Sequence, residues 1–388
     1  MDFTYPPEAE AFRKELRVWL EANMREYVGV GLGSGLAAEG ETLEKLHQWN
    51  RLLAEARFAA ISWPEEYGGR GAGTMEQVVF AEEMHRAGAP ATLNPLGLSN
   101  IAPAIIQFGT EDQKRRFLPA MLRGDDIWCQ GFSEPEAGSD LASLKCSAVR
   151  DGDVFVVNGQ KTWNTLGHMA NWCELLVRTD TSAPKHKGIS CLLVDMTLRG
   201  IEVRPLTTIT GEQEFNEIFF TDARIPVEAL LGPEHEGWRV AMTTLAYERG
   251  TVANLHLSLR SKIRGLLDEA KTTVVDDEGG TAAQDPVLRQ KLAQVYLEGE
   301  LLKLVSERAI SGAIHGRDLG PESSIAKLVW SEAEQHVGEA AGDVLGTDAN
   351  SGKWGRDRVY MRALTIAGGT TQVNKNILAQ RILGLPRR

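Results

Sequence analysis

The chain has 388 residues, 43% of them hydrophobic and 24% charged, with a formal net charge of −11 at pH 7. This acidic balance without a basic tract argues against nucleic acid as a partner, although a local cationic patch for a phosphorylated small molecule stays open. The sequence has no run of 18 apolar residues and starts with a charged amphipathic pattern, so we expect no membrane span and no export. The length allows two or three domains, and we expect a cytoplasmic protein.

The cysteines and histidines do not form a metal-binding pattern. The four cysteines are Cys129, Cys146, Cys173 and Cys191, and their spacing matches neither a zinc site nor a CxxC redox pair. The eight histidines are scattered and include no HExxH motif. We therefore expect reduced, mostly buried cysteines and no metal site.

The chain up to residue 127 has the apolar spacing of amphipathic helices. The residues that line one face of the first helix are Phe12, Leu16, Trp19 and Leu20. Similar patterns recur over 43–57, 75–87 and 111–122. We predict an N-terminal α-helical domain over 1–127.

The periodicity changes between residues 128 and 233 to short runs rich in Val, Ile, Phe and Trp, separated by turn residues. These runs are 153–163, 173–179, 188–196, 200–206 and 215–225. They predict a compact antiparallel β-barrel or sandwich over 128–233.

From residue 234 to 388 the helical period returns. Asp285 and Pro286 have the composition of an N-cap and first turn, which predicts a long helix to about residue 315. Further helices are expected over 321–345 and 371–383. The whole chain is therefore predicted to have an α+β fold, with a β domain between two helical domains.

An acid interrupts an apolar helical stripe in the segment LAYERG, residues 245–250. The stripe consists of Ala241, Leu245, Glu248, Val252, Leu255 and Leu259. At this spacing Glu248 shares a face with buried residues. From this helix alone two interpretations stay open: a glutamate at the stripe edge that reaches water or an arginine, and a functional carboxylate.

Two segments of the middle region carry small and polar residues typical of a ligand site. In CQGFSEPEAGSD (129–140), glycines permit close approach of backbone N–H groups to a ligand, and Ser133 and Ser139 add donors. In QKTWNTLG (160–167), Trp163 and Thr165 are predicted on the same face of a strand. The indole there either stacks on a flat cofactor or fills a β core.

Five motifs in this order resemble the acyl-CoA dehydrogenase family of flavoproteins. They are GFSEPEAGSD, NGQKTWNT, LGPEHEGW, the YERG helix and TIAGGTTQVNKNILAQRILGLPR, and together they extend over nearly the whole chain. The resemblance implies a helical domain, a β-barrel and a C-terminal four-helix bundle. It also implies FAD as cofactor, oxidation of an acyl-CoA substrate to 2-enoyl-CoA, and an electron-transfer flavoprotein as acceptor.

The resemblance also implies roles for individual residues. Gln130, Phe132 and Ser133 match residues that contact the flavin ring. Ser139 matches a serine that meets the pantetheine of CoA or the FAD diphosphate. The remaining residues that match positions near the FAD are Trp163, Thr165, Thr370 and Gln372.

The position of the catalytic base departs from the commonest pattern of the family. Where many members read tyrosine, glutamate, glycine, threonine, this chain has Ala367, Gly368, Gly369 and Thr370. A smaller set places the acid on the first long helix of the C-terminal domain before an arginine, as in the pair Glu248 and Arg249 here. The resemblance therefore implies that Glu248 is the base that removes the α-proton.

The other residues near this position receive supporting roles. The backbone N–H of Gly368 matches a donor to the thioester carbonyl, and the missing side chain suggests a pocket for branched or bulky acyl groups, including steroid fragments. Tyr247 and Arg249 are candidate substrate contacts, and for Arg249 a structural ion pair stays open.

A second departure concerns assembly. Homotetramers of the family carry an arginine, two residues and then Phe-Gly, and this arginine reaches the FAD diphosphate of a neighbouring subunit. The segment 271–290 has no Phe-Gly and no arginine at that spacing before one. The turn at 343–352 is altered as well. The alternatives are a homodimer or homotetramer with other contacts, an α2β2 assembly with a homologous chain, or a non-catalytic scaffold subunit. Oxidase or monooxygenase chemistry on the same fold is a further alternative.

Overall fold

The structure is a computed structural model that describes residues 5–30, 40–250, 254–315 and 323–386. The chain divides into two compact units. The sheet unit comprises Lys14–Gly73 and Arg86–Glu248, and the bundle unit comprises Met1–Arg13, Thr74–His85 and Arg249–Arg388. Across the described ranges, no helix combines the length and the apolar character needed to cross a membrane.

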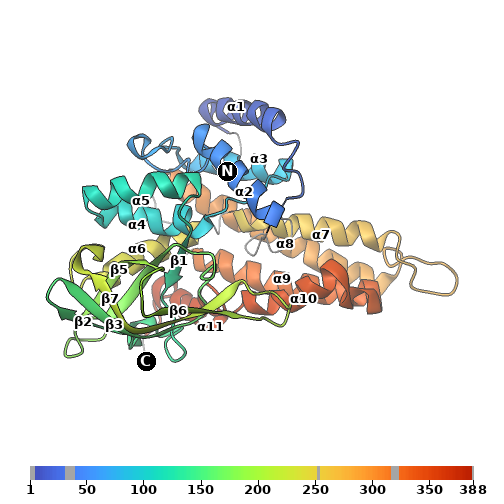
Figure 1. The fold of residues 1–388 in the computed structure, drawn as a ribbon. Helices are drawn as coiled ribbons and strands as arrows, with labels where there is room; N and C mark the ends of the chain where they lie inside the picture. Colours follow the sequence, from blue (N-terminus) through green and yellow to red (C-terminus); the bar gives the residue numbers. More distant parts are fainter. Residues whose placement is uncertain (1–4, 31–39, 251–253, 316–322, 387–388) are drawn as a thin grey trace. The chain divides into compact units, whose positions relative to one another are not determined.

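Helices form most of the chain outside residues 128–226 (Figure 1). The α-helices are α1 (Pro7–Asn23), α2 (Gly40–Glu55), α3 (Thr74–Ala87), α4 (Ala102–Phe108), α5 (Glu111–Arg123), α6 (Gly237–Gly250), α7 (Leu255–Ala270), α8 (Pro286–Ile314), α9 (Ser323–Leu345), α10 (Gly352–Leu364) and α11 (Thr371–Ile377). The predicted helical character of both ends of the chain is confirmed. Phe12, Leu16 and Leu20 on α1 are buried, as their spacing predicts.

The middle region forms one seven-stranded sheet. Its strands are β1 (Trp128–Gly131), β2 (Ser147–Asp151), β3 (Val154–Lys161), β4 (Trp172–Arg178), β5 (Ile189–Asp195), β6 (Ile201–Leu206) and β7 (Phe215–Pro226). The hydrogen-bonded order is β1-β4-β2-β3-β7-β6, and β5 pairs with β4. The five predicted strand segments correspond to β3 through β7.

The prediction of an antiparallel barrel is wrong. β1 and β2 both pair with β4 in parallel, so the sheet is mixed, and it curls without closing. Parallel neighbours require a long connection, and β3 with the segment 162–171 provides the one from β2 to β4. Residue periodicity identifies a strand but not its partner, which is why the sequence did not show this pairing.

The sheet unit has a core on each face of the sheet. On one face, side chains of α4, α5 and α6 pack with those of β1, β4 and β5 in one apolar cluster. Figure 1 shows these three helices on the same side of the sheet. On the other face, the curled sheet encloses a second cluster formed by its own side chains, including Phe155, Val157 and Phe220. All four cysteines are buried free thiols, which confirms that prediction.

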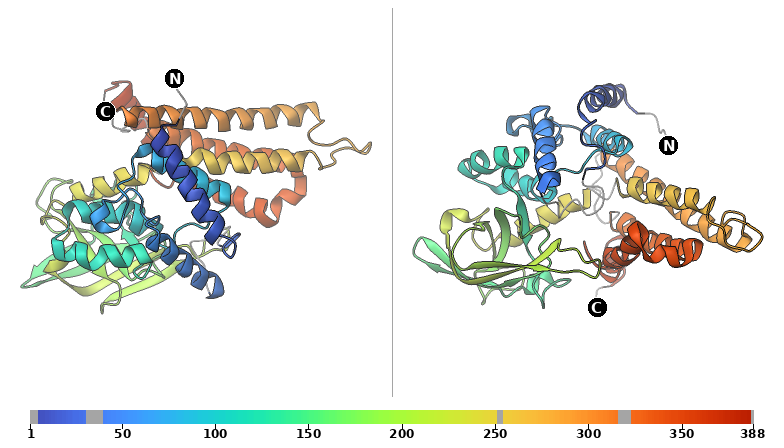
Figure 2. Two further views of the ribbon diagram at one scale, coloured as in Figure 1. Left: turned by 90° about the horizontal axis from the view of Figure 1, so that it is seen from above. Right: turned by 45° about the vertical axis from the view of Figure 1, so that its right-hand side comes forward.

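The bundle unit packs α7, α8, α9 and α10 around one apolar core, and the long helices lie side by side in all views (Figures 1 and 2). Its central residues include Leu259, Leu302, Val337 and Met361. Asp285 accepts hydrogen bonds from the N–H groups of Val287 and Leu288, so its predicted role as the cap of α8 is confirmed.

Some elements differ from the predictions. α4 and α10 were not expected, because α4 is only seven residues long and α10 begins in a glycine-rich segment that reads as a turn. The stripe from Ala241 to Leu259 is not one helix, since α6 ends at Gly250 and α7 begins at Leu255. Val252 lies outside the described residues.

Candidate active site

The segment after β1 is held by a buried ion pair. Nζ of Lys161, which is fully buried, donates to Oε1 of Glu134 at 2.8 Å and to the carbonyl oxygen of Phe132 at 3.1 Å. The Glu134 carboxylate also accepts the backbone N–H groups of Lys145 and Cys146, at 2.7 and 2.8 Å. Because every charge has a partner, the pair tolerates burial and fixes both ends of the segment 132–146.

The predicted ligand residues of this segment have different environments. Phe132 is buried, Ser133 is half-buried and Ser139 is exposed. The carbonyl oxygen of Ser133 accepts the N–H of Thr162 at 2.9 Å. This bond connects the segment after β1 with the turn that contains Trp163.

Trp163 and Thr165 do not lie on a strand, so that prediction is wrong. β3 ends at Lys161, and Trp163 has φ of 61°, a left-handed conformation that costs energy for a bulky residue. The sequence pattern of β3 continues past this point without a glycine or proline, which hid the turn. Trp163 is 62% exposed and contacts Phe215 edge-on, with 5.9 Å between the ring centroids. A strained, exposed tryptophan is a feature of binding sites.

Asn164 ties this turn to β1 and β7. Its Nδ2 donates to the carbonyl oxygen of Gln130 at 2.6 Å. Its backbone N–H donates to the carbonyl oxygen of Asn216 at 3.0 Å. Nδ2 of Asn216 donates in return to the carbonyl oxygen of Asn164 at 2.9 Å. The structure therefore brings together Gln130, Ser133 and the turn of Trp163 and Thr165, while Ser139 lies further along its loop.

Two buried side-chain amides around this turn are incompletely hydrogen-bonded. Oδ1 of Asn164 and Oδ1 of Asn216 have no partner within the described part of the chain. Gln130 lies opposite Glu174, and its amide interacts with that carboxyl group. Buried polar atoms without partners are costly and rare, so the two acceptors on Asn164 and Asn216 indicate a place for a ligand with donor groups at its edge. This set, beside an exposed indole, fits a flat heteroaromatic group such as a flavin.

α6 carries the predicted base. The helix begins against β5, where a Cβ on Gly237 would approach the carbonyl carbon of Ser190 to 2.3 Å, so only glycine fits. Ala241 is buried, Leu245 is partly buried and Tyr247 is half-exposed. Glu248 and Arg249 belong to the last turn of α6, but their side chains lie outside the described part of the structure.

Sequence reasoning missed the buried acid Glu174 on β4. Its Oε1 accepts the hydroxyl of Thr244 on α6 at 2.8 Å. The available signal was the run WCELLVR, where an acid interrupts an otherwise apolar strand.

The C-terminal site residues lie in the bundle unit, on a glycine turn between α10 and α11. Gly368 and Gly369 have φ of 61° and 89°, which favour glycine. Thr370 caps α11 by accepting the N–H of Val373 at 3.1 Å, and Gln372 is exposed. The turn is anchored by Lys327 of α9, whose buried Nζ donates to the carbonyl oxygens of Leu364 and Gly369 at 2.9 and 2.8 Å.

Three family models match the chain in succession. They are the acyl-CoA dehydrogenase N-terminal domain over 6–125, the middle domain over 129–223 and the C-terminal domain over 235–383. The acyl-CoA dehydrogenase IpdE1 of Mycobacterium tuberculosis is 39% identical over 389 residues, with 98% of each chain covered. The protein of the same name from Mycolicibacterium smegmatis is 38% identical over 400 residues, again with 98% of each chain covered.

Solved structures agree with these matches. The steroid acyl-CoA dehydrogenase Tcur3481–Tcur3483 has a chain that is 29% identical with a TM-score of 0.85, and 100% of both chains is covered. The ChsE4–ChsE5 complex from Mycobacterium tuberculosis contains a chain that is 34% identical to this one, with a TM-score of 0.84 and 100% of both chains covered.

The first prediction concerns the Lys161–Glu134 pair. Replacing Glu134 with alanine leaves a buried cation and two N–H groups without their acceptor, so we expect a loss of about 3–5 kcal/mol in unfolding free energy. Denaturant unfolding followed by tryptophan fluorescence measures the change. The control is Glu136→Ala, which removes only a surface pair with Lys145. Equal unfolding midpoints for the two variants would contradict this role of the pair.

The second prediction concerns the glycine turn. Lys327→Met removes the donor to two carbonyl oxygens while keeping an unbranched side chain, so we expect a loss of about 1–3 kcal/mol. Lys375→Met is the matched control, because Lys375 is exposed and lies 3.7 Å from Glu332 on the surface. A thermal unfolding midpoint of Lys327→Met no lower than that of the control would show that the turn does not depend on Lys327.

Proposed function

We propose, for a chain that belongs to the acyl-CoA dehydrogenase family, that Glu248 is the catalytic base and that the acyl group of the substrate is bulky. The protein is an oxidoreductase that acts on a CH–CH bond of an acyl-CoA thioester. The proposal rests on which of two sequence positions carries the acid. Gly368 stands where many members have their acid, and Glu248 stands at the alternative position before an arginine.

FAD is the proposed cofactor. Gln130, Phe132, Ser133 and the turn with Trp163 and Thr165 would hold the flavin, with Thr370 and Gln372 as further contacts. The unpaired Oδ1 atoms of Asn164 and Asn216 support this assignment, because the polar edge of a flavin includes an N–H donor. Bound FAD supplies the acceptor for the hydride that leaves the β-carbon of the substrate.

The chain's own residues are proposed to perform the proton transfer. The carboxylate of Glu248 accepts the proton from the α-carbon, while the N–H of Gly368 donates to the thioester oxygen, where negative charge develops. Tyr247, Arg249 and Ser139 are proposed to bind and orient the substrate. An electron-transfer flavoprotein is the proposed acceptor of the electrons.

The bulky acyl group is supported by the absence of a side chain at Gly368. A glycine in the left-handed region leaves space where other members carry a glutamate. One similar solved structure is that of a steroid acyl-CoA dehydrogenase, which favours a steroid thioester as the first substrate to test. We also propose a cytoplasmic location, because four buried free thiols suit a reducing compartment.

The third prediction tests the base. Under anaerobic conditions, wild-type protein loaded with FAD should lose its visible absorbance when a steroid side-chain CoA thioester is added. Glu248→Gln should hold the same amount of flavin and reduce it at least about 10³-fold more slowly, because an amide cannot take the α-proton. The visible spectrum before and after mixing measures both quantities.

The control for this experiment is Glu236→Gln, which changes an exposed carboxylate that precedes the same helix. Unchanged bleaching by Glu248→Gln would show that another acid is the base. Faster reduction by butyryl-CoA than by the steroid thioester would contradict the bulky acyl group. Rapid reoxidation by air alone would favour an oxidase.

For assembly, we propose an α2β2 complex with a homologous chain, which supplies the arginine of the Phe-Gly motif that is missing from segment 271–290. One similar solved structure is the complex of two differently named chains, ChsE4 and ChsE5. α8 carries an exposed apolar stripe of Leu297, Leu301 and Leu304, at the spacing of one helix face. Such a stripe on a long helix is typical of a subunit interface.

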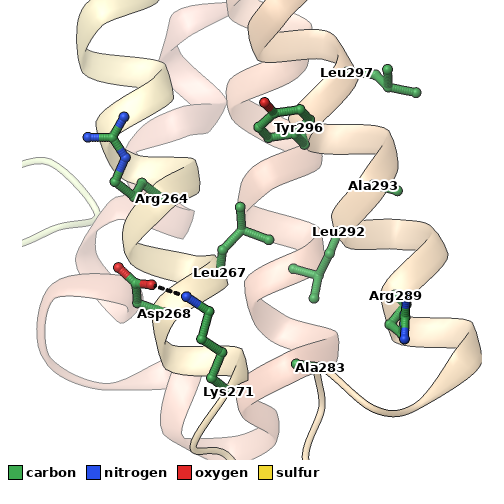
Figure 3. Close-up of a pocket in the computed structure, with 10 residues that line it drawn as sticks. All are labelled: Arg264, Leu267, Asp268, Lys271, Ala283, Arg289, Leu292, Ala293, Tyr296 and Leu297. Atoms are coloured by element: carbon green, nitrogen blue, oxygen red, sulfur yellow. Dashed lines mark hydrogen bonds and ion pairs between the residues drawn. The ribbon is translucent and has the colours of Figure 1, made fainter.

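A shallow groove between α7 and α8 adjoins this stripe (Figure 3). Its volume is about 720 Å³, and Leu292, Tyr296 and Leu297 form part of its apolar lining. Arg264 and Arg289 add positive charge at its edges. None of the predicted catalytic or flavin-binding residues lines this groove, which supports a role in assembly and not in catalysis.

The fourth prediction tests the interface. Leu301→Arg places a charge in the stripe, so we expect light scattering to show a smaller assembly than for the wild type. Val149→Arg, at an exposed position of β2, is the control and should assemble normally. The chain produced alone should bind less than one FAD per subunit. Co-expression with the homologous chain should restore full FAD binding. A homotetramer with full FAD from this chain alone would contradict the proposal.

A further inference from the structure

Glu174 lies on the face of the sheet that is covered by helices. It lies opposite Gln130 of β1 in the parallel pairing of β1 with β4. Its neighbours along β4, Cys173 and Leu175, point to the other face of the sheet. Its neighbours on the same face of β4, Trp172 and Leu176, pack in the apolar cluster with α4, α5 and α6. Glu174 itself is 0% exposed.

The hydrogen bonds available to Glu174 suit a neutral acid. Oε1 accepts from the hydroxyl of Thr244 at 2.8 Å and faces the thiol of Cys191 at 3.9 Å. Oε2 has no hydrogen-bond partner in the described parts of the chain. The side-chain amide of Gln130, opposite Glu174 in register, also interacts with the carboxyl group. A carboxylate with only these neutral donors and no cation beside it is poorly compensated for burial.

The electrostatic surroundings agree with this neutral state. Burial raises the pKa of Glu174 to about 8, although hydrogen bonds from the side chains of Thr244, Gln130 and Cys191 act in the opposite direction. The titratable groups that interact with it are Cys191 on β5 and Cys173 on β4, and burial raises the pKa of both thiols well above the usual range. No cation is among the groups that affect its pKa.

Thr244 connects this acid to the helix of the catalytic base. It is fully buried, and its hydroxyl also lies 3.4 Å from the carbonyl oxygen of Val240 in the preceding turn. Glu248 follows Thr244 by four residues, and positions four apart lie on the same face of a helix. A displacement of α6 at Thr244 therefore moves the backbone at Glu248.

We propose that Glu174, as a neutral acid bonded to Thr244, is a positioning residue that fixes α6 on the sheet one helical turn before Glu248. This inference rests on the proposed function of Glu248. Glu174 does not itself touch the substrate. Glu174 fixes the position of the backbone that carries Glu248. A small displacement of a base has a large effect on the rate of proton transfer.

Three variants separate the hydrogen bond from the charge. Glu174→Gln keeps an acceptor for Thr244 but cannot ionise. Glu174→Met keeps the length of the side chain without an acceptor, and Thr244→Val removes the donor at constant shape. Leu176→Met, a volume-conserving change at the next position on the same face of β4, is the control for general disturbance of the strand.

The measurement is the anaerobic rate of flavin reduction by the acyl-CoA, from pH 6 to pH 9, with flavin content recorded for each variant. We expect Glu174→Met and Thr244→Val to be slower by at least about tenfold with normal flavin content, and their double variant to be no slower than either. The wild-type rate should fall above about pH 8, because an ionised Glu174 is an uncompensated buried charge that disturbs the contact of α6 with the sheet, and Glu174→Gln should lack this fall. Wild-type rates in both single variants, or multiplicative losses in the double variant, would overturn the proposal.

A second readout does not depend on activity. Because the pKa of Glu174 is raised in the folded state from an ordinary 4.5, its contribution to stability is full below that value and is lost as pH rises through about 8. The thermal midpoint of the wild type should therefore fall relative to Glu174→Gln between about pH 5 and about pH 8. A constant difference would show that Glu174 is not neutral and would overturn the proposal.

The two readouts distinguish the failure of this inference from failure of the proposed function. If Glu248→Gln reduces flavin at the wild-type rate, Glu248 is not the base, and Glu174 cannot act by positioning it. If Glu248 proves to be the base but both hydrogen-bond variants react normally, only the positioning role fails.

Discussion

The flavin-binding half of the proposed site depends on one buried ion pair, Lys161 with Glu134. Burial of the lysine is tolerated only because the carboxylate and the carbonyl oxygen of Phe132 accept its hydrogen bonds. The same carboxylate binds the chain at Lys145 and Cys146, so the whole segment from 132 to 146 closes around it. The bond from Thr162 to Ser133 then sets the turn in which Trp163 stands exposed in a strained conformation.

The sequence predicted much of this organisation and missed specific parts of it. Strand periodicity located β3 to β7, and the Asp285 cap located the start of α8. Strand pairing was not predictable, since the parallel contacts of β4 with β1 and β2 join segments far apart in the sequence. The turn after Lys161 was also missed, because tertiary hydrogen bonds from Asn164 stabilise a conformation that local propensity does not favour.

The residues of the candidate site were likewise predicted only in part. Motif resemblance selected Gln130, Ser133 and Trp163, and the structure places them around one set of unpaired amide atoms. It did not select Asn164, Asn216 or Glu174, whose importance depends on burial and hydrogen bonding that no motif contains. Two acids thus have contrasting proposed roles: Glu248 takes the proton as a carboxylate, and Glu174 stays neutral in an apolar cluster to hold the helix.

The most direct test of the central claim is the kinetic isotope effect on flavin reduction. Stopped-flow measurements would compare a bulky acyl-CoA with the same compound deuterated at the α-carbon, for the wild type under anaerobic conditions. If Glu248 removes the α-proton during reduction, the deuterated substrate should bleach the flavin more slowly, and Glu248→Gln should show no comparable bleaching with either substrate. Equal rates for both substrates, together with normal bleaching by the glutamine variant, would contradict the assignment of Glu248 as the base.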